Sequence, residues 1–251
     1  MRPRQNPWLK RISNSVGEAD YQKAIEILIR TFRTPEQSLD SLSKHLGIDE
    51  IVREPLPFEG GVYELDGKRL IKLNSLAVPR RQAFSLAHEL SHLILERNLG
   101  AAVSCVEDEA LEYACDKVAS ELLMPAGKVV GFADALGQQS PEKLSTVANH
   151  FGVSLQTAAQ RLYDLGLWKW GTGMWKCSPE AREMWFVGKK PWNTERPSFS
   201  AFGLAIESKT PVCTKERFSK GSYTELVALK AHHIGKNFVV AIVAAAINPK
   251  L

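Results

Sequence analysis

The segment Phe84-Ser-Leu-Ala-His88-Glu89-Leu-Ser-His92-Leu-Ile-Leu95 decides how the first half of this chain folds. Its apolar residues recur at helical spacing and nearly surround the helix, which predicts a largely buried element. Residues four apart lie on one face of a helix, so His88 and His92 can present two imidazoles to one metal ion. Glu89 then lies beside the ion, where it can accept a proton from water. The pattern predicts a zinc site with a general base, as in zinc peptidases.

The alternative for these two histidines is a solvated pair on an amphipathic helix. The apolar surroundings of His88 and His92 argue against it, because buried polar groups require partners. One metal ion would satisfy both imidazoles at once, so the sequence favours a metal site.

The third protein ligand is expected downstream, because a catalytic zinc keeps three protein ligands and one open position. Residues Glu107 to Pro125 predict a second amphipathic helix, which the proline ends. Glu112 and Asp116 are four apart and flank its apolar face. We assign Glu112 as the ligand and Asp116 as the acceptor of a ligand histidine's ring N–H. The acidic residues that compete for these roles are Glu107, Asp108, Glu109 and Glu121.

The run from Arg80 to Pro125 resembles the ImmA/IrrE family of metallopeptidases. The more discriminating part is Glu112-Tyr-Ala-Cys-Asp-Lys-Val-Ala-Ser-Glu-Leu-Leu-Met-Pro125, which follows the histidine motif. The resemblance implies one Zn²⁺ ion held by His88, His92 and Glu112, with Glu89 as the catalytic base. It also implies that Asp116 orients a ligand histidine.

The chain departs from the family pattern at three positions of the second motif. Val118 stands where the family usually has Phe, and Ala114-Cys115 stands where Glu-Ala is common. These are core or rim positions, so the departures leave the expected zinc chemistry unchanged.

The N-terminal part predicts two helices and a hairpin. Helical periodicity covers Ala19 to Phe32 and Leu39 to Leu46. Gly61 to Leu73 predicts two short strands joined at Asp66-Gly67, a hairpin signal. The segment Val62 to Asn74 is our candidate for a strand edge that pairs with an extended peptide, and an ordinary supporting sheet is the alternative.

Residues Leu144 to Gly166 predict a helix, a Phe-Gly-Val-Ser turn and a second helix, which resembles a helix-turn-helix unit. Substrate docking or structural support is favoured over DNA contact, because such units also serve as packing modules. The residues of the second helix that would face a groove or partner are Gln156, Thr157, Gln160 and Arg161.

The C-terminal part is rich in glycine, proline and aromatic residues and predicts a small α+β domain. In placement it resembles the GAF-like sensor domain of longer family members. Its adjacent histidines, His232 and His233, would point to opposite faces of a strand, which argues against a shared metal. The predicted strands are Met184 to Val187, Ala201 to Ile206, Glu225 to Ala231 and Asn237 to Ala245.

The predicted elements and the family resemblance imply an α+β protein, and the length indicates two domains with a connecting segment. The chain has 251 residues, of which 44% are hydrophobic, enough to bury a sizeable core. We expect a mainly helical, zincin-like peptidase domain with a small β-sheet at 1–140. The helix-turn-helix segment follows at 141–170 and the small α+β domain, for sensing or recruitment, at 171–251.

Other features of the sequence narrow the class of protein. The four cysteines form no Cys-x-x-Cys pair, so a disulfide framework is not indicated. No apolar run approaches the roughly 18 residues of a membrane span, and the N-terminus lacks the apolar core of a signal peptide. A net charge of +4 is weak support for nucleic-acid binding. We expect a cytoplasmic protein with no membrane partner.

The expected activity is that of a zinc-dependent endopeptidase. The family resemblance implies site-specific cleavage of a helix-turn-helix transcriptional repressor, which derepresses a stress, DNA-damage or mobile-element response. The alternatives are a zinc-containing regulator that acts by binding DNA or a partner, and a toxin–antitoxin component. A neutral donor to the oxyanion is also expected, with Tyr63 and Tyr113 as candidates.

Overall fold

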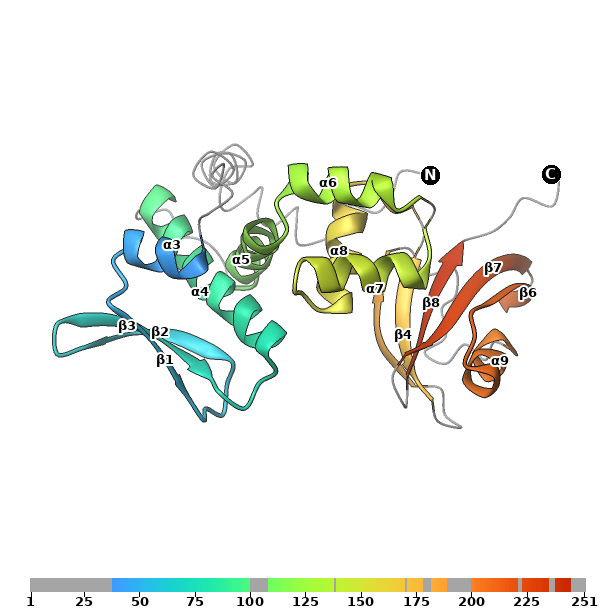
Figure 1. Cartoon of the computed structure of the whole chain (residues 1–251), viewed down its shortest axis with the longest axis horizontal. Coiled ribbons are helices and arrows are strands. Elements are labelled where there is room, and N and C mark those ends of the chain that lie inside the picture. Colours follow the sequence, from blue (N-terminus) through green and yellow to red (C-terminus); the bar gives the residue numbers. More distant parts are fainter. Residues whose placement is uncertain are drawn as a thin grey trace. The chain divides into compact units, whose positions relative to one another are not determined.

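The computed structural model describes residues 38–99, 108–137, 139–169, 171–177, 182–188, 200–220, 223–234 and 238–244 (Figure 1). They form an α+β structure, as predicted, with two compact units that divide between Ala126 and Gly127. The predicted helix Ala19 to Phe32 lies outside the described residues. In the part of the chain that is described, no helix is both long and apolar enough to cross a membrane.

The described residues of the first unit form three helices and a three-stranded sheet. The strand order is β1-β3-β2, with β1 parallel and β2 antiparallel to β3. Figure 1 shows α3 and α4 on the same side of this sheet. The elements are α3 (Leu39–His45), β1 (Glu50–Glu54), β2 (Gly60–Leu65), β3 (Lys68–Asn74), α4 (Pro79–Leu99) and α5 (Asp108–Leu123).

The predicted hairpin is confirmed, and it joins β2 to β3 at Asp66-Gly67. Both turn residues have positive φ, 52° and 74°, which the two-residue hairpin turn of type I′ requires. Leu65 pairs with Lys68 directly across this turn. The turn therefore sets the register that places alternate residues of β2 toward α4.

The structure corrects the expected strand edge. The segment Val62 to Asn74 was expected to offer an edge, but its second half, β3, is the middle strand and pairs on both sides. The cause is β1, a strand that the sequence analysis did not predict and that occupies the other side of β3. Of the two strands in Val62 to Asn74, only β2 is an edge strand of the described sheet.

The core of the first unit lies between the sheet, α4 and α5. Leu90, Ile71 and Val118 are fully buried and come from these three elements. Small residues of α5, Ala114 and Ala119, are also buried in this cluster, so α5 can approach α4 closely. Apolar packing thus holds the two site-bearing helices together.

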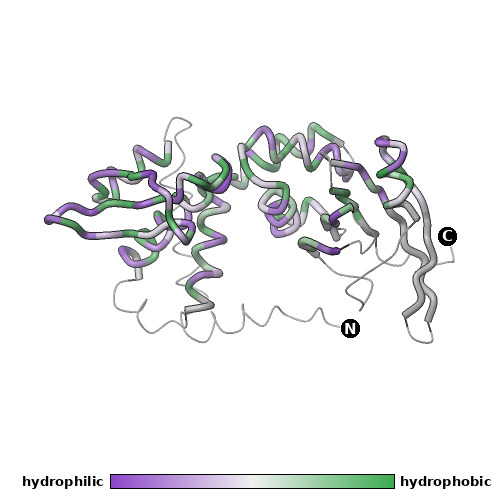
Figure 2. Tube along the Cα trace, turned by 90° about the horizontal axis from the view of Figure 1, so that it is seen from below, coloured by the Kyte–Doolittle hydropathy of each residue, from purple (hydrophilic) through white to green (hydrophobic). Residues whose placement is uncertain are grey.

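The second unit begins with a helix that the sequence analysis did not predict, α6 (Ala126–Ala135). The helix-turn-helix segment follows as α7 (Pro141–His150) and α8 (Leu155–Asp164). Each of these two helices starts at a serine N-cap, Ser140 and Ser154, whose hydroxyl accepts a backbone N–H three residues on. Hydrophilic and hydrophobic residues alternate along the helices of both units (Figure 2).

The rest of the second unit is a five-stranded antiparallel sheet with the order β5-β4-β8-β7-β6. Three of the four predicted strands lie in β5, β7 and β8, whereas β4 and β6 were not predicted. The elements are β4 (Gly171–Lys176), β5 (Glu183–Val187), α9 (Ser200–Ser208), β6 (Val212–Lys220), β7 (Tyr223–Ile234) and β8 (Phe238–Ala244).

Helices cover both faces of this sheet. On one face His232 contacts Glu142 of α7, with 3.1 Å between Nδ1 and Oε1. On the other, Trp175 packs on Phe202 of α9, with ring centroids 4.8 Å apart. His232 and His233 are consecutive in β7 and so point to opposite faces, as predicted.

One predicted strand is wrong. Residues Ala201 to Ile206 form part of the helix α9. Phe202 and Ala205, three apart, are buried, whereas Gly203 and Leu204 between them are exposed. This is helical spacing, and a short apolar run cannot by itself distinguish a strand from a helix that packs on a sheet.

Gly173 in β4 is required by the packing of the second unit. A Cβ atom there would lie 2.6 Å from the ring of Trp175 and 2.7 Å from that of Phe186. Both rings are held by the core, so we expect Gly173→Ala to lower the free energy of unfolding by about 1–3 kcal/mol through overpacking. Urea unfolding followed by circular dichroism measures the change.

The matched control for this variant is Gly203→Ala in α9, where nothing lies within 4 Å of the added methyl group. A helical Gly-to-Ala change should raise the free energy of unfolding by roughly 0.5–1 kcal/mol. Equal effects of the two substitutions would contradict the close packing at Gly173.

Candidate metal centre

Two consecutive turns of α4 carry the motif His88-Glu89-Leu-Ser-His92. His88 and His92 are half-buried, with 18% and 28% of their side chains exposed. Between them Ser91 is fully buried, and its hydroxyl donates to the carbonyl of Ala87 at 2.6 Å. The two histidines therefore point out of the same helix face toward α5, and Ser91 is turned back on its own helix.

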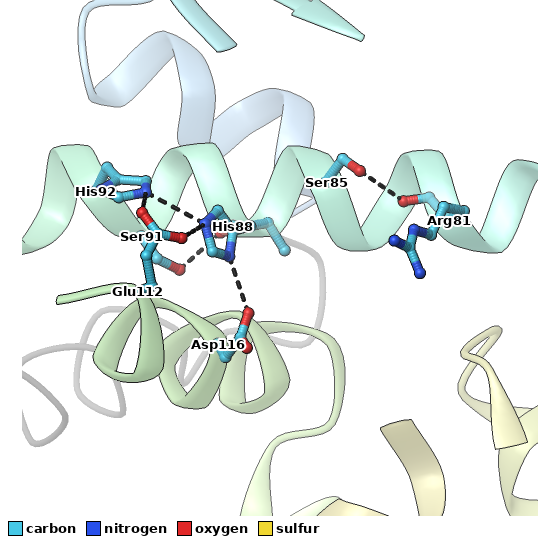
Figure 3. A network of polar contacts seen from close by, with 8 residues as sticks. Arg81, Ser85, His88, Ser91, His92, Glu112 and Asp116 are labelled. Carbon is cyan, nitrogen blue, oxygen red and sulfur yellow. Dashed lines mark hydrogen bonds and ion pairs between the residues drawn. The ribbon is translucent and has the colours of Figure 1, made fainter. Parts of the chain in front are cut away.

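The structure brings both histidines together with Glu112 of α5 (Figure 3). The Nε2 atoms of His88 and His92 are 3.2 Å apart. Glu112 approaches each of them with a different carboxylate oxygen, 3.0 Å from His88 Nε2 and 3.4 Å from His92 Nε2. Three side chains from two helices thus converge on one point.

The donor set fits a metal ion in both spacing and chemistry. Atoms bound tetrahedrally to zinc lie roughly 3.4 Å apart, given bonds of about 2.1 Å, and the observed separations are close to this. The two Nε2 atoms and the carboxylate oxygens are also all acceptors when both imidazoles are neutral and carry their proton on Nδ1. They repel one another at these distances unless a proton or a cation lies among them. Imidazole and carboxylate are common ligands of divalent zinc.

Asp116 contacts the other side of the His88 ring. Its Oδ1 atom lies 3.0 Å from His88 Nδ1, one helical turn along α5 from Glu112 (Figure 3). A carboxylate at Nδ1 favours a proton on that nitrogen, which leaves Nε2 with a lone pair directed at the cluster. Asp116 therefore orients His88 in the tautomer that a metal ligand needs.

The environment of the cluster shifts the pKa values of the two histidines in opposite directions. Burial lowers the pKa of His88, but the hydrogen bond and charge of Asp116, with the charges of Glu112 and Glu89, outweigh it and raise that pKa above its usual value. Burial and the neighbouring His88 lower the pKa of His92, against the charges of Glu112 and Asp116. The two pKa values therefore move in opposite directions, that of His88 upward and that of His92 downward.

Glu89 lies between this cluster and the sheet. Burial raises its pKa, with Glu112 adding to the rise and His88 opposing it. A Cβ atom built on Gly60 at the start of β2 would be 3.8 Å from Glu89 Cγ. A carboxylate with a raised pKa is a stronger base, and the absence of a side chain at residue 60 leaves room beside it. Gly60 was not predicted from the sequence, although the Gly60-Gly61 pair before Val62 could have indicated a close approach of the backbone.

The competing acidic residues are placed as follows. Glu121 is 8% exposed, and its Oε1 atom accepts the backbone N–H of Ala126 at 3.1 Å, at the start of α6. This oxygen of Glu121 therefore contacts the start of α6 rather than the cluster. Glu107 and the side chains of Asp108 and Glu109 lie outside what the structure describes.

Of the two proposed tyrosine donors, Tyr63 lies on the face of the sheet that points away from the core. Tyr63 alternates with Val62 in β2, and Val62 packs on the core below α4, so Tyr63 points to the opposite face of the sheet. There its ring lies 5.5 Å from Lys72 Nζ. Tyr113 packs partly on the core, with Lys117 Nζ 5.0 Å from its ring. The role of oxyanion donor is therefore not supported for Tyr63.

The four residues singled out on α8 differ in accessibility. Gln156 is exposed, whereas Thr157 and Gln160 are partly buried, and the side chain of Gln160 donates to Asp164 at 2.8 Å. Arg161 is only 8% exposed, and its Nη2 atom is buried. The one cationic side chain of the set is therefore not presented on the helix surface.

Cys115 lies under the cluster, fully buried in the core of the first unit. Burial and the charges of Glu112, Asp116 and Glu89 all raise the pKa of its thiol far above the usual value. The thiolate is the metal ligand and the nucleophile, so a thiol held protonated packs as an apolar residue. Cys115 and the other family departures, Ala114 and Val118, are all core residues here.

The contact between Asp116 and His88 generates a testable prediction. Asp116→Asn keeps the size of the side chain but removes the charge that favours a proton on Nδ1. We expect about a 10- to 100-fold loss of zinc affinity, measured by competition with a chromogenic chelator. Asp134→Asn, at an exposed residue of α6, is the control and should bind zinc normally. Equal affinity of both variants would show that Asp116 has no effect on the ligand.

The burial of Cys115 predicts its reactivity. In the folded chain Cys115 should resist alkylation by iodoacetamide at neutral pH, because it is inaccessible and protonated. Cys213 is exposed and should be modified in the same reaction. Peptide mass spectrometry identifies the labelled residues, and rapid labelling of Cys115 before Cys213 would contradict the packing described.

Comparisons with known proteins agree with this geometry. Residues 44–163 match the model of a peptidase family described as the IrrE N-terminal-like domain. The match includes α4 and α5 with the whole cluster, and it extends through α8. No curated protein sequence matches the chain.

A solved structure, a Mycobacterium tuberculosis transcriptional regulator, shares the fold. It is 15% identical, with a TM-score of 0.57, and the similarity covers 91% of this chain and 76% of that one. Residues 44–163 thus resemble an IrrE N-terminal-like domain, and the His-His-Glu cluster lies within this matched segment.

Proposed function

We propose that this chain is a zinc-dependent endopeptidase that cleaves a helix-turn-helix transcriptional repressor. Cleavage would then relieve repression of a stress, DNA-damage or mobile-element response. The observation that carries the proposal is the convergence of His88, His92 and Glu112, with Glu89 next to them on α4.

Each side chain of the cluster has a separate part in this reaction. His88, His92 and Glu112 would hold a zinc ion, which would supply Lewis acidity to a peptide carbonyl and to a water molecule beside it. Glu89 accepts the proton of that water and later returns it to the leaving amine. Asp116 holds His88 in orientation through Nδ1.

An extended substrate can reach this site along β2. One edge of β2 pairs with β3, and its first residue, Gly60, lies beside Glu89. A substrate segment that adds to the other edge as a further strand would place its backbone next to the general base. Backbone hydrogen bonds then select an extended conformation, which an exposed or locally unfolded linker adopts more readily than a helix.

The regulatory character of the substrate has independent support. The matched family is named for IrrE, and the Mycobacterium tuberculosis protein with the same fold is a transcriptional regulator. A peptidase on such a scaffold fits the limited cleavage of a transcription factor better than general protein degradation.

The alternative is a regulator that binds DNA through α8 without proteolysis. Arg161 was the charged residue expected in a groove, and its burial leaves only polar, uncharged side chains in the set of four. DNA binding depends largely on cations that neutralise phosphates. The structure of α8 therefore favours the proteolytic proposal, in which α7 and α8 support the second unit.

The decisive variant is Glu89→Gln, which removes the base and keeps the size of the side chain. With zinc-loaded protein and the helix-turn-helix repressor encoded beside its gene, we expect cleavage to fall by about 10²- to 10⁴-fold, while one zinc ion per chain is retained. Intact-mass spectrometry measures the products, and elemental analysis measures the metal.

The control is Glu96→Gln, which removes an exposed carboxylate from the same helix and should cleave at the native rate. Undiminished cleavage by Glu89→Gln would eliminate Glu89 as the base. If the native protein leaves the repressor intact but binds operator DNA tightly, the non-proteolytic alternative replaces the proposal.

A further inference from the structure

Asn74, the last residue of β3, joins the two loops at one end of the three-stranded sheet. Its side-chain oxygen accepts the backbone N–H of Leu56 at 3.3 Å and that of Leu76 at 3.0 Å. Leu56 belongs to the β1–β2 loop and Leu76 to the loop that leads into α4. Its own backbone N–H donates to the carbonyl of Glu59 at 3.0 Å. One residue therefore holds both loops.

The same two loops are attached to the start of α4. The Nη2 atom of Arg81 lies 3.0 Å from the Oε1 atom of Glu59, so the two side chains form an ion pair. Gln82 donates from its side-chain nitrogen to the carbonyl of Ala77 at 2.7 Å. The contact with Glu59 is exposed and so contributes little by itself. The amide of Asn74 is the part of the network that reaches both loops at once.

The position of β2 beside the site depends on this loop end. Gly60 follows Glu59 directly, and a Cβ atom on it would lie 3.0 Å from the carbonyl of Lys72 in β3 and 3.8 Å from Glu89 Cγ in α4. A shift of the loop would therefore move the first residue of β2 relative to the base. Displacement of reacting groups by about 1 Å can cost roughly 100-fold in rate.

We propose that Asn74 is a positioning residue for peptide cleavage, acting through β2. By holding the loop before Gly60, its side-chain oxygen sets the distance between the strand that receives the substrate backbone and Glu89. The inference rests on the proposed peptidase function and extends it to a residue that touches neither the metal ligands nor the substrate.

The test compares Asn74→Ala with Asn74→Asp in the full, zinc-loaded chain. Alanine removes both acceptor contacts, whereas aspartate keeps an oxygen that can accept from Leu56 and Leu76. We expect Asn74→Ala to lower kcat/KM on the repressor by about tenfold or more. Asn74→Asp should remain within about threefold of the native value. Zinc content should stay at one ion per chain in both variants.

Hydrogen exchange provides a second readout that does not depend on activity. The amides of Leu56 and Leu76 should exchange faster in Asn74→Ala and remain protected in Asn74→Asp. Asn149→Ala, an exposed asparagine of α7, is the control and should change neither exchange at these amides nor cleavage.

The outcomes separate the two proposals. Native kcat/KM in Asn74→Ala, or a failure of aspartate to restore it, overturns the positioning role. Loss of zinc together with activity assigns Asn74 a general structural role instead. If the native protein cleaves no repressor, the peptidase proposal fails, and unchanged exchange at Leu56 and Leu76 in Asn74→Ala would then reject the loop network as well.

Discussion

The packing of α4 on α5 is the contact on which the rest of the site depends. Two members of the cluster, His88 and His92, come from one helix and Glu112 from the other, so their separation depends on that of the two helices. Ala114, Cys115 and Ala119 keep α5 close to α4, because small buried side chains allow helices to approach. A larger residue at any of these positions would separate Glu112 from His88 and His92.

This packing also forces acceptor atoms together at a cost in electrostatic free energy. His88 Nε2 faces His92 Nε2 and Glu112 at 3.0–3.2 Å, and such a cluster is stable only with a cation or a proton inside it. The pKa of His88 is raised for the same reason, because the neighbouring carboxylates favour a positive charge on its ring. A metal ion bound by these three side chains would therefore add to the stability of the first unit, because its bonds would replace the repulsion.

The three-stranded sheet limits where an extended peptide could pair with the chain. β1 and β2 flank β3, so β2 alone offers an edge next to α4. Asn74 and the turn at Asp66-Gly67 hold the two ends of the β2–β3 hairpin. The His-His-Glu cluster and the proposed substrate edge are thus positioned by different parts of one unit, which meet at Glu89 and Gly60.

Local sequence determined the helices α4, α5, α7 and α8, the β2–β3 hairpin and the donor groups of the cluster. Helical spacing placed His88 and His92 on one face, and i, i+4 spacing placed Glu112 with Asp116, because these patterns depend only on nearby residues. Tertiary structure decided that Glu112 rather than Glu121 joins the histidines, that Tyr63 points away, that Arg161 is buried and that 201–206 is helical. Each of these depends on which surfaces pack together, and packing between distant segments leaves no periodic signal in the sequence.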